Sequence, residues 1–195
     1  MDDTATAIGF DFTAHMRRLC ADMAQRLPEL AHLDMARIAI RFCQTRKPVR
    51  HGVFASVTPL RFAGGDTTLH RCGQRWTIQR VTDPSGREML YLVSFYLPRF
   101  LNLSFREKLS TVVHELWHIS PEFNGDLRRH PGRCWAHSHS QAAYDRAMDS
   151  LADKWLALDP PAELHEFLAL DFRHLQLRHG RVFGTRIRTP KLIRA

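Results

Sequence analysis

The sequence predicts an α+β domain, because helical and strand patterns occupy separate stretches of the chain. A helical pattern comes first, three to four strand patterns follow, and three helical patterns complete the chain, without the alternation that is typical of parallel-sheet proteins. The length of 195 residues and the hydrophobic fraction of 44% predict one domain with a packed core. No run approaches the roughly 20 apolar residues of a membrane span, so we expect no membrane partner.

The N-terminal part of the chain predicts one helix and two strands. Pro28 ends a helical stripe of apolar residues that consists of Phe12, Met16, Leu19, Cys20, Met23 and Leu27. In the next segment Ile38, Ile40 and Phe42 alternate with Arg37, Ala39 and Arg41, which is the pattern of a strand. Residues 52–62 predict a second strand near a sheet edge, because Pro59 has no N–H to donate to a neighbouring strand.

A hairpin is predicted next. Residues 74–82 and 88–97 flank Asp83-Pro84-Ser85-Gly86, a sequence typical of a type I turn. The second strand of this hairpin contains MLYLVSFYL and is expected to be largely buried. With the preceding segments it predicts a small, mostly antiparallel sheet of three to four strands.

Two C-terminal helices complete the expected fold. One covers about Ser140 to Leu158, and the other begins after Pro160-Pro161. The second carries the apolar residues Leu164, Phe167, Leu168 and Leu175. We expect residues 1–179 to form the domain and residues 180–195 to form a basic C-terminal tail.

The formal net charge of +8 is unevenly distributed. Seven Lys or Arg residues and no acidic residue follow Asp171, whereas the first 171 residues carry a net charge of only +1. The segment 172–195 therefore suits nucleic acid or another acidic partner. A solvated terminus that keeps the protein soluble explains the same composition.

The cysteines and the N-terminus indicate a cytoplasmic protein. Cys20, Cys43, Cys72 and Cys134 form no CxxC pair, which excludes a zinc ribbon, and they are too sparse for a small disulfide scaffold. We expect reduced thiols. The N-terminal sequence MDDTATAIGFDF is acidic where a secretory signal peptide is basic.

The most informative segment begins at Ser104, which forms a predicted capping box with Glu107. The helix that follows has an apolar stripe made of Phe105, Leu109, Val112, Val113 and Leu116. At about 100° per residue, His114 and His118 point roughly 180° and 220° away from Phe105. Both imidazoles are therefore expected to face away from the core, into a cleft.

His114-Glu115-Leu116-Trp117-His118 is an HExxH sequence. Two neutral imidazoles one helical turn apart can reach the same Zn²⁺ at about 2.0–2.1 Å each. Glu115 is then placed beside the metal, where it can take a proton from water that attacks a carbonyl. The motif predicts Zn²⁺ as cofactor, His114 and His118 as ligands, and Glu115 as general base.

A catalytic zinc usually takes a third protein ligand and keeps a fourth position for water. Ser120-Pro121 ends the helix and Gly125 permits a sharp reversal, so His130 is the first candidate for this ligand. The alternatives are His137, His139, Asp145 and Asp149.

Other polar residues near the motif could stabilise the oxyanion of a tetrahedral intermediate. The candidates are Arg128, Arg129, His137 and Tyr144, each of which also suits a structural or surface role. For Trp117, packing explains its position better than substrate binding.

The run HELWHISPEFNGDLRRHPG resembles the signature of a family of phage metallopeptidases, zincin-like proteins of phages, bacteria and archaea. The matching positions are His114, Glu115, Leu116, His118, Ile119, Phe123, Gly125, Leu127, Arg128 and His130. The chain differs in two places: Ser120 shifts the proline by one position, and Pro131 separates His130 from Gly132.

This resemblance implies a zincin-like fold and a zinc peptidase of a phage or prophage. It implies His114, His118 and His130 as the metal ligands and Glu115 as the base. By analogy with zincin-like folds, the strand at 88–97 would present its edge to an extended peptide.

The leading hypothesis is thus a zinc-dependent metallopeptidase that acts on a peptide or protein substrate. The alternative is a DNA-associated protein in which the zinc is structural and the basic tail contacts nucleic acid. A zinc hydrolase that acts on another amide or an ester would carry the same motif.

Overall fold

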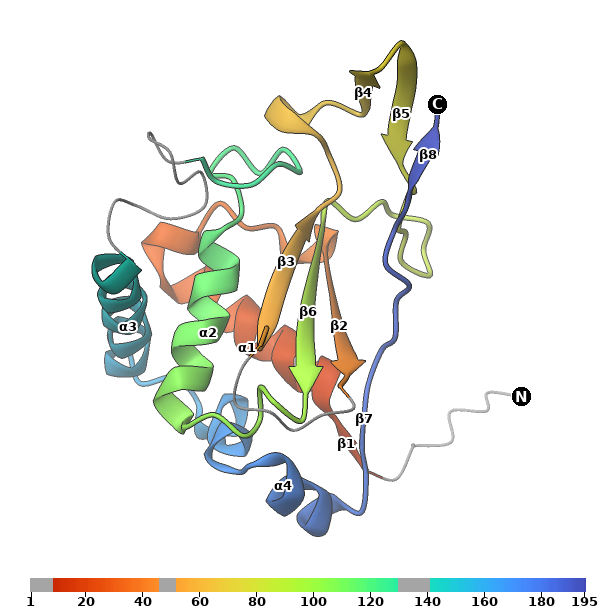
Figure 1. The fold of residues 1–195 in the computed structure, drawn as a ribbon. Coiled ribbons are helices and arrows are strands. Elements are labelled where there is room, and N and C mark those ends of the chain that lie inside the picture. Colours follow the sequence, from red (N-terminus) through yellow and green to blue (C-terminus); the bar gives the residue numbers. More distant parts are fainter. Residues whose placement is uncertain (1–8, 46–51, 130–140) are drawn as a thin grey trace.

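The computed structural model describes residues 9–45, 52–129 and 141–195. A three-stranded sheet lies against a layer of helices, and a second three-stranded sheet projects from one end of the molecule (Figure 1). The predicted α+β class is confirmed. No described helix has both the length and the apolar character that a membrane crossing needs.

The central sheet has the strand order β2 (Ile38–Gln44), β6 (Tyr91–Leu97), β3 (Ala55–Pro59). Strand β6 is parallel to β2 and antiparallel to β3. The sheet is therefore mixed, and the prediction of a mostly antiparallel sheet is wrong for it. Strand β3 is an edge strand, as its proline predicts, whereas β6 lies in the centre. The strand at 88–97 thus does not present the exposed edge that we expected of it.

The predicted hairpin between residues 74–82 and 88–97 is also wrong. Strand β5 (Gln74–Ile78) pairs instead with β4 (Thr68–Arg71) and β8 (Leu192–Arg194), both antiparallel. The described pairing between the two predicted strands is limited to one bridge, Thr82 to Glu88. The reason lies in the apolar sequence of β6, which is buried on both faces and takes the central place in the main sheet, whereas the polar β5 belongs to the exposed projecting sheet.

Helices α1 (Phe12–Arg26) and α2 (Phe105–Trp117) cover one face of the central sheet, and α3 (Gln141–Ala157) packs against α2 (Figure 1). The core between these layers includes Met16 and Leu19 of α1 and Leu109 and Val112 of α2. Trp155 of α3 is fully buried, and its indole N–H donates to the Asp22 carboxylate at 2.8 Å. This contact joins α3 to α1.

The C-terminal segment passes the free edge of β2, where the Thr185 carbonyl accepts the Phe42 N–H at 3.3 Å, and reaches the opposite face of the sheet. Strand β7 (Val182–Phe183) pairs in parallel with β1 (Phe10–Asp11), and Ile187 packs on a second apolar cluster of Ala39, Leu60, Met89 and Leu92. The guanidinium of Arg41 donates to the Ser94 hydroxyl, to the Ile187 carbonyl and to the Thr189 hydroxyl. Residues 184–190, which we call the C-terminal strap, are thus fixed to the body of the protein.

The last helix is shorter than the sequence predicts. Residues Ala162–Leu164 and Glu166–Ala169 form 3₁₀ turns, and α4 covers only Phe172–His179. The carbonyls of Leu168 and Leu170 accept hydrogen bonds from the buried Lys108 ammonium, each at 2.8 Å, instead of continuing a helix. Asp171 then caps the new helix. Further 3₁₀ turns cover Pro28–Leu30, Met35–Arg37 and Ala63–Gly65.

Three of the cysteines are described, and all three are free thiols. Cys20 is buried, Cys43 is half-buried and Cys72 is exposed. Burial raises the pKa of the Cys20 thiol to about 12, so it remains protonated at neutral pH. Cys134 lies outside the described residues.

Candidate metal centre

The HExxH motif lies on α2, and local sequence explains both ends of this helix. The Ser104 hydroxyl accepts the Glu107 N–H at 3.3 Å, and the Glu107 carboxylate accepts the Ser104 N–H at 2.8 Å. The predicted capping box is therefore confirmed. At the other end, Pro121 cannot continue the helix, and the helical residues stop at Trp117.

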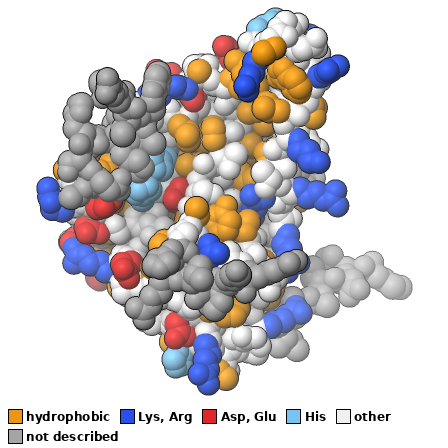
Figure 2. Space-filling view, viewed as in Figure 1, with side chains coloured by type: hydrophobic (Ala, Val, Ile, Leu, Met, Phe, Trp, Pro, Cys, Tyr) orange, Lys and Arg blue, Asp and Glu red, His pale blue; other side chains and the backbone are white. Residues whose placement is uncertain are grey.

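His114 and His118 come together on the face of α2 opposite the apolar stripe. Leu109, Val112, Val113 and Leu116 are fully buried, whereas both histidines are partly exposed. Their Nε2 atoms lie 2.9 Å apart. Figure 2 shows histidine side chains at the surface over α2, beside acidic and apolar groups. The two imidazoles thus point to one place, as the helical spacing predicts.

Glu115 is buried beside this pair, with only 8% of its surface exposed. Burial raises the pKa of Glu115 to about 7, and the backbone N–H of Val57, which the carboxylate accepts, opposes this rise. Val57 belongs to the edge strand β3. The carboxyl group is therefore enclosed between α2 and the edge of the sheet, where it can exchange a proton near neutral pH.

Tyr144 of α3 packs against both histidines. Its ring centroid lies 5.0 Å from that of His114 in an edge-on arrangement and 6.0 Å from that of His118. Burial raises the pKa of the Tyr144 hydroxyl, the charge of Glu115 raises it further, and Arg128 opposes these effects. The phenol therefore stays protonated, which is the state in which it can donate a hydrogen bond to an anionic oxygen.

The chain reverses after α2 and returns alongside the histidines. Ile119 pairs with Leu127, and the Arg128 N–H donates to the His118 carbonyl at 2.7 Å. The Tyr91 hydroxyl accepts the Gly125 N–H and donates to the carbonyl of Asp126, both at 2.9 Å. The return loop, residues 119–129, is therefore anchored to the central strand β6.

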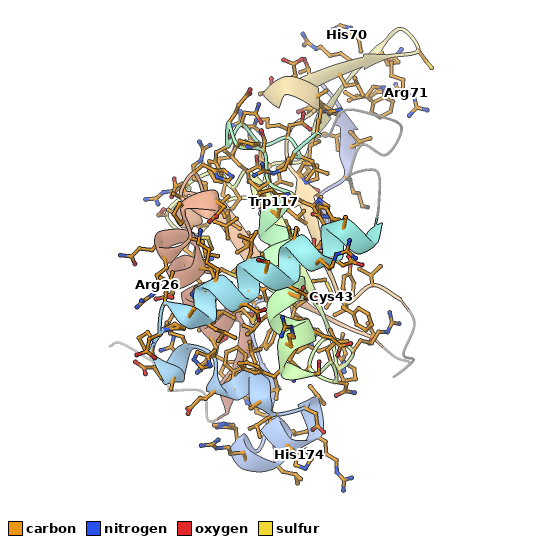
Figure 3. The ribbon with its side chains drawn as sticks, turned by 90° about the vertical axis from the view of Figure 1, so that its left-hand side faces the viewer. Arg26, Cys43, His70, Arg71, Trp117 and His174 are labelled. Carbon is orange, nitrogen blue, oxygen red and sulfur yellow. The ribbon has the colours of Figure 1, made fainter. Side chains whose placement is uncertain are left out.

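The two arginines of the return loop are already engaged. Arg128 donates from Nε to the Trp117 carbonyl at 2.7 Å, and its guanidinium lies 4.0 Å from the centre of the Trp117 ring. Arg129 pairs with the buried Asp126 carboxylate at 2.9 Å. Trp117, visible at the upper end of α2 in Figure 3, thus serves as a packing surface for Arg128. Arg128 remains close enough to Tyr144 to influence its pKa.

A cavity of about 220 Å³ adjoins His114 between α2 and α3. Asp145 and Asp149 line it together with Glu107, and Phe54 and Leu103 contribute apolar surface. In residues 9–45, 52–129 and 141–195, no three His, Cys, Asp or Glu side chains gather as a metal site. Within that part of the chain, Asp145 and Asp149 do not complete a ligand set with the two histidines.

The remaining candidate ligands, His130, His137 and His139, lie outside the described residues. Two neighbours of the site have no signal in the sequence. Val57 reaches Glu115 through its backbone N–H, and His32 approaches the backbone of Ile119 from the loop after α1. Burial lowers the pKa of His32, and the nearby charge of Arg128 lowers it further. Contacts of this kind depend on the fold and not on side-chain spacing.

Comparisons of the chain with protein-family models, with curated proteins and with solved structures gave no match.

Proposed function

We propose that this protein is a zinc-dependent metallopeptidase that hydrolyses peptide bonds. The observation that carries the proposal is the pairing of the His114 and His118 Nε2 atoms at 2.9 Å beside a buried carboxyl group on the same helix. A surface histidine pair would not require a buried Glu115 next to it. The zincin-like character of the fold is part of the same proposal.

The donor set fits Zn²⁺. Two neutral imidazole nitrogens at this separation can both bind one ion, because Zn–N bonds are about 2.0–2.1 Å long. His114 and His118 would hold the ion, with His130 as the third ligand. His130 follows Arg128 by two residues in the sequence, and the backbone of Arg128 is hydrogen-bonded to His118, which supports His130 as a candidate. A bound Zn²⁺ supplies Lewis acidity, which polarises a carbonyl oxygen and lowers the pKa of water.

Two side chains of the protein would act on the reacting groups. Glu115 accepts a proton from the attacking water and later donates it to the nitrogen of the departing amine. Tyr144, kept protonated by burial, can donate a hydrogen bond to the oxygen that becomes negative. The cavity beside His114 offers space for a substrate side chain.

The first test compares the wild-type protein with Glu115→Gln and His118→Ala, with hydrolysis of an unfolded protein as the assay. We expect Glu115→Gln to keep its zinc and to lose activity by about 10²–10⁴-fold, because a general base is removed. His118→Ala should lose both zinc and activity. Full activity of Glu115→Gln would contradict the proposal.

The second test separates a catalytic zinc from a structural one and identifies the third ligand. Zinc content is measured for His130→Ala and His137→Ala, and folding is followed by circular dichroism after chelation. We expect His130→Ala to lose zinc and the chelated protein to stay folded. If the protein unfolds on chelation and Glu115→Gln has no effect on hydrolysis, the results would favour the alternative of a DNA-associated protein with a structural metal.

A further inference from the structure

Two short segments carry the entire formal net charge of the chain. Residues 67–81 and 181–195 contain eight Lys or Arg residues and no Asp or Glu, whereas the other 165 residues contain 20 of each sign. About a hundred residues separate these segments in the sequence. Pairing of β5 with β8 places them side by side, from Trp76 opposite Arg194 to Ile78 opposite Leu192. The charge is therefore concentrated on one surface by the fold.

This surface extends along one edge of the molecule. The C-terminal strap runs up the body and ends in β8, next to the projecting strands β4 and β5 (Figure 1). Figure 2 shows Lys and Arg side chains along this edge, and Figure 3 places His70 and Arg71 at its far end, distant from Trp117. We call the exposed side chains of β4, β5, β8 and residues 186–191 the basic edge.

Within the part of the chain that the structure describes, the cations of the basic edge form no ion pair. Arg71, Arg75 and Arg194 are exposed, and none of them takes part in an ion pair with the described residues. The same holds for Arg188 and Lys191. By contrast, Arg61 of the body pairs with Glu88 at 2.7 Å. The charges of the basic edge are thus available to an external polyanion.

Apolar side chains lie among these cations. In the register of the projecting sheet, Trp76 lies opposite Leu69 on one side and Arg194 on the other, so the three share one face. Trp76 is half-buried, whereas Leu69 and Leu192 are 40% and 54% exposed. An aromatic ring between a cation and exposed apolar surface suits an unpaired base next to its phosphate. A duplex would engage the cations but not the apolar groups.

We propose that the basic edge binds single-stranded nucleic acid, with its arginines on the phosphates and Trp76 as a stacking surface for a base. This site is separate from the metal centre, and the proposal does not depend on the peptidase assignment. It differs from contact through a free basic tail, because β4 and β5 contribute Arg71, Arg75 and Trp76 to the surface.

The test measures binding of the full-length protein to a fluorescent single strand of about 20 nucleotides, as DNA and as RNA, over a range of salt concentrations. The variant combines Arg71→Glu, Arg75→Glu and Arg194→Glu. The matched control combines Arg18→Glu, Arg146→Glu and Arg173→Glu, which are exposed residues elsewhere on the surface with the same change in net charge. Circular dichroism confirms that both variants fold.

We expect the basic-edge variant to bind at least tenfold more weakly, and its plot of log affinity against log salt to be shallower by about 2, as for three lost phosphate contacts. The control should stay within about threefold of the wild-type protein. Equal losses in both variants, or no binding by the wild-type protein near physiological salt, would overturn the proposal. The DNA and RNA arms show whether a 2′-hydroxyl contributes to the affinity.

Further arms separate the single strand from other polyanions. Trp76→Ala should weaken binding of the single strand by about tenfold and duplex binding much less, and Trp76→Phe should restore most of the affinity. Equal affinity for duplex and single strand, with no effect of Trp76→Ala, would reject a single-strand site. Equally effective competition by polyglutamate would instead indicate an acidic protein as the partner.

Discussion

The carboxylate of Glu115 lies against the backbone N–H of Val57, which joins the HExxH helix to the open edge of the sheet. On either side of β3, the Phe54 carbonyl accepts the Tyr96 N–H of β6 and the Leu60 N–H donates to the Leu90 carbonyl, so the backbone N–H and C=O groups of even-numbered residues face the partner strand. In an antiparallel pair the intervening residues point their N–H groups the other way. The N–H of Val57 therefore points away from β6, at the open edge of the sheet, and the Glu115 carboxylate accepts a hydrogen bond from it.

This arrangement predicts that Glu115 reduces the stability of the metal-free protein. At pH 8 the buried carboxyl group is ionised, because this pH lies above its raised pKa of about 7. Glu115→Gln keeps an acceptor for Val57 without a buried charge, so we expect the free energy of unfolding to rise by about 1–2 kcal/mol. Urea denaturation with a chelator measures this change. The exposed control Glu163→Gln should have almost no effect, and an unchanged or lower stability of Glu115→Gln would contradict the prediction.

The features of α2 could be predicted because they are local. The capping box, the apolar stripe and the separation of the two histidines all lie within about four turns of one helix, and helical geometry alone relates them. The central position of β6 and the pairing of β5 with β8 join distant segments. A turn-like sequence at residues 83–86 suggested a local hairpin, but burial of the apolar strand on both faces decided the pairing.

For the candidate site, sequence spacing indicated the histidines and Glu115 but not their surroundings. Tyr144 reaches the histidines because it lies one turn before Met148 on the buried face of α3. That position depends on how α3 packs on α2. Likewise, the engagement of Arg128 with Trp117 follows from the path of the return loop, which no local pattern fixes.

Tyr91→Phe is expected to loosen the return loop. The fully buried hydroxyl accepts the Gly125 N–H and donates to the Asp126 carbonyl. Its removal leaves both groups without this partner. We expect the free energy of unfolding to fall by about 1–3 kcal/mol in urea denaturation. The control Tyr96→Phe removes one longer contact with Ser56, at 3.3 Å, and should cost less. Equal losses in the two variants would mean that the hydroxyl of Tyr91 does not anchor the loop.

Because Lys108 is buried, we expect the free energy of unfolding of the protein to rise with pH in the alkaline range. Burial lowers the pKa of the Lys108 ammonium group to about 8, against the opposing charge of Asp171. Between pH 8 and about 10.4 the unfolded chain keeps this proton while the folded protein releases it, so the free energy of unfolding increases with pH. Since methionine has no proton to release, the stability of the wild-type protein relative to Lys108→Met should grow across this range. Denaturation curves at several pH values test this, and a constant or shrinking difference would contradict it.

Gly125→Ala is expected to be strongly destabilising. Gly125 has a φ of +91°, and a Cβ atom there would lie 2.4 Å from Cγ of Arg61. Its N–H and carbonyl are held by Tyr91 and by the Arg61 N–H, so the backbone cannot shift to relieve the contact. Strain and overlap together should lower the free energy of unfolding by about 2–5 kcal/mol.

Gly73→Ala is the matched comparison for this change, because Gly73 has a similar φ of +68° but no atom within 4 Å of the added Cβ. Conformational strain alone should then cost about 1–2 kcal/mol. Thermal and urea denaturation of the two variants separate strain from overlap. If both changes cost the same, contact with Arg61 does not explain why the return loop has a glycine at this position.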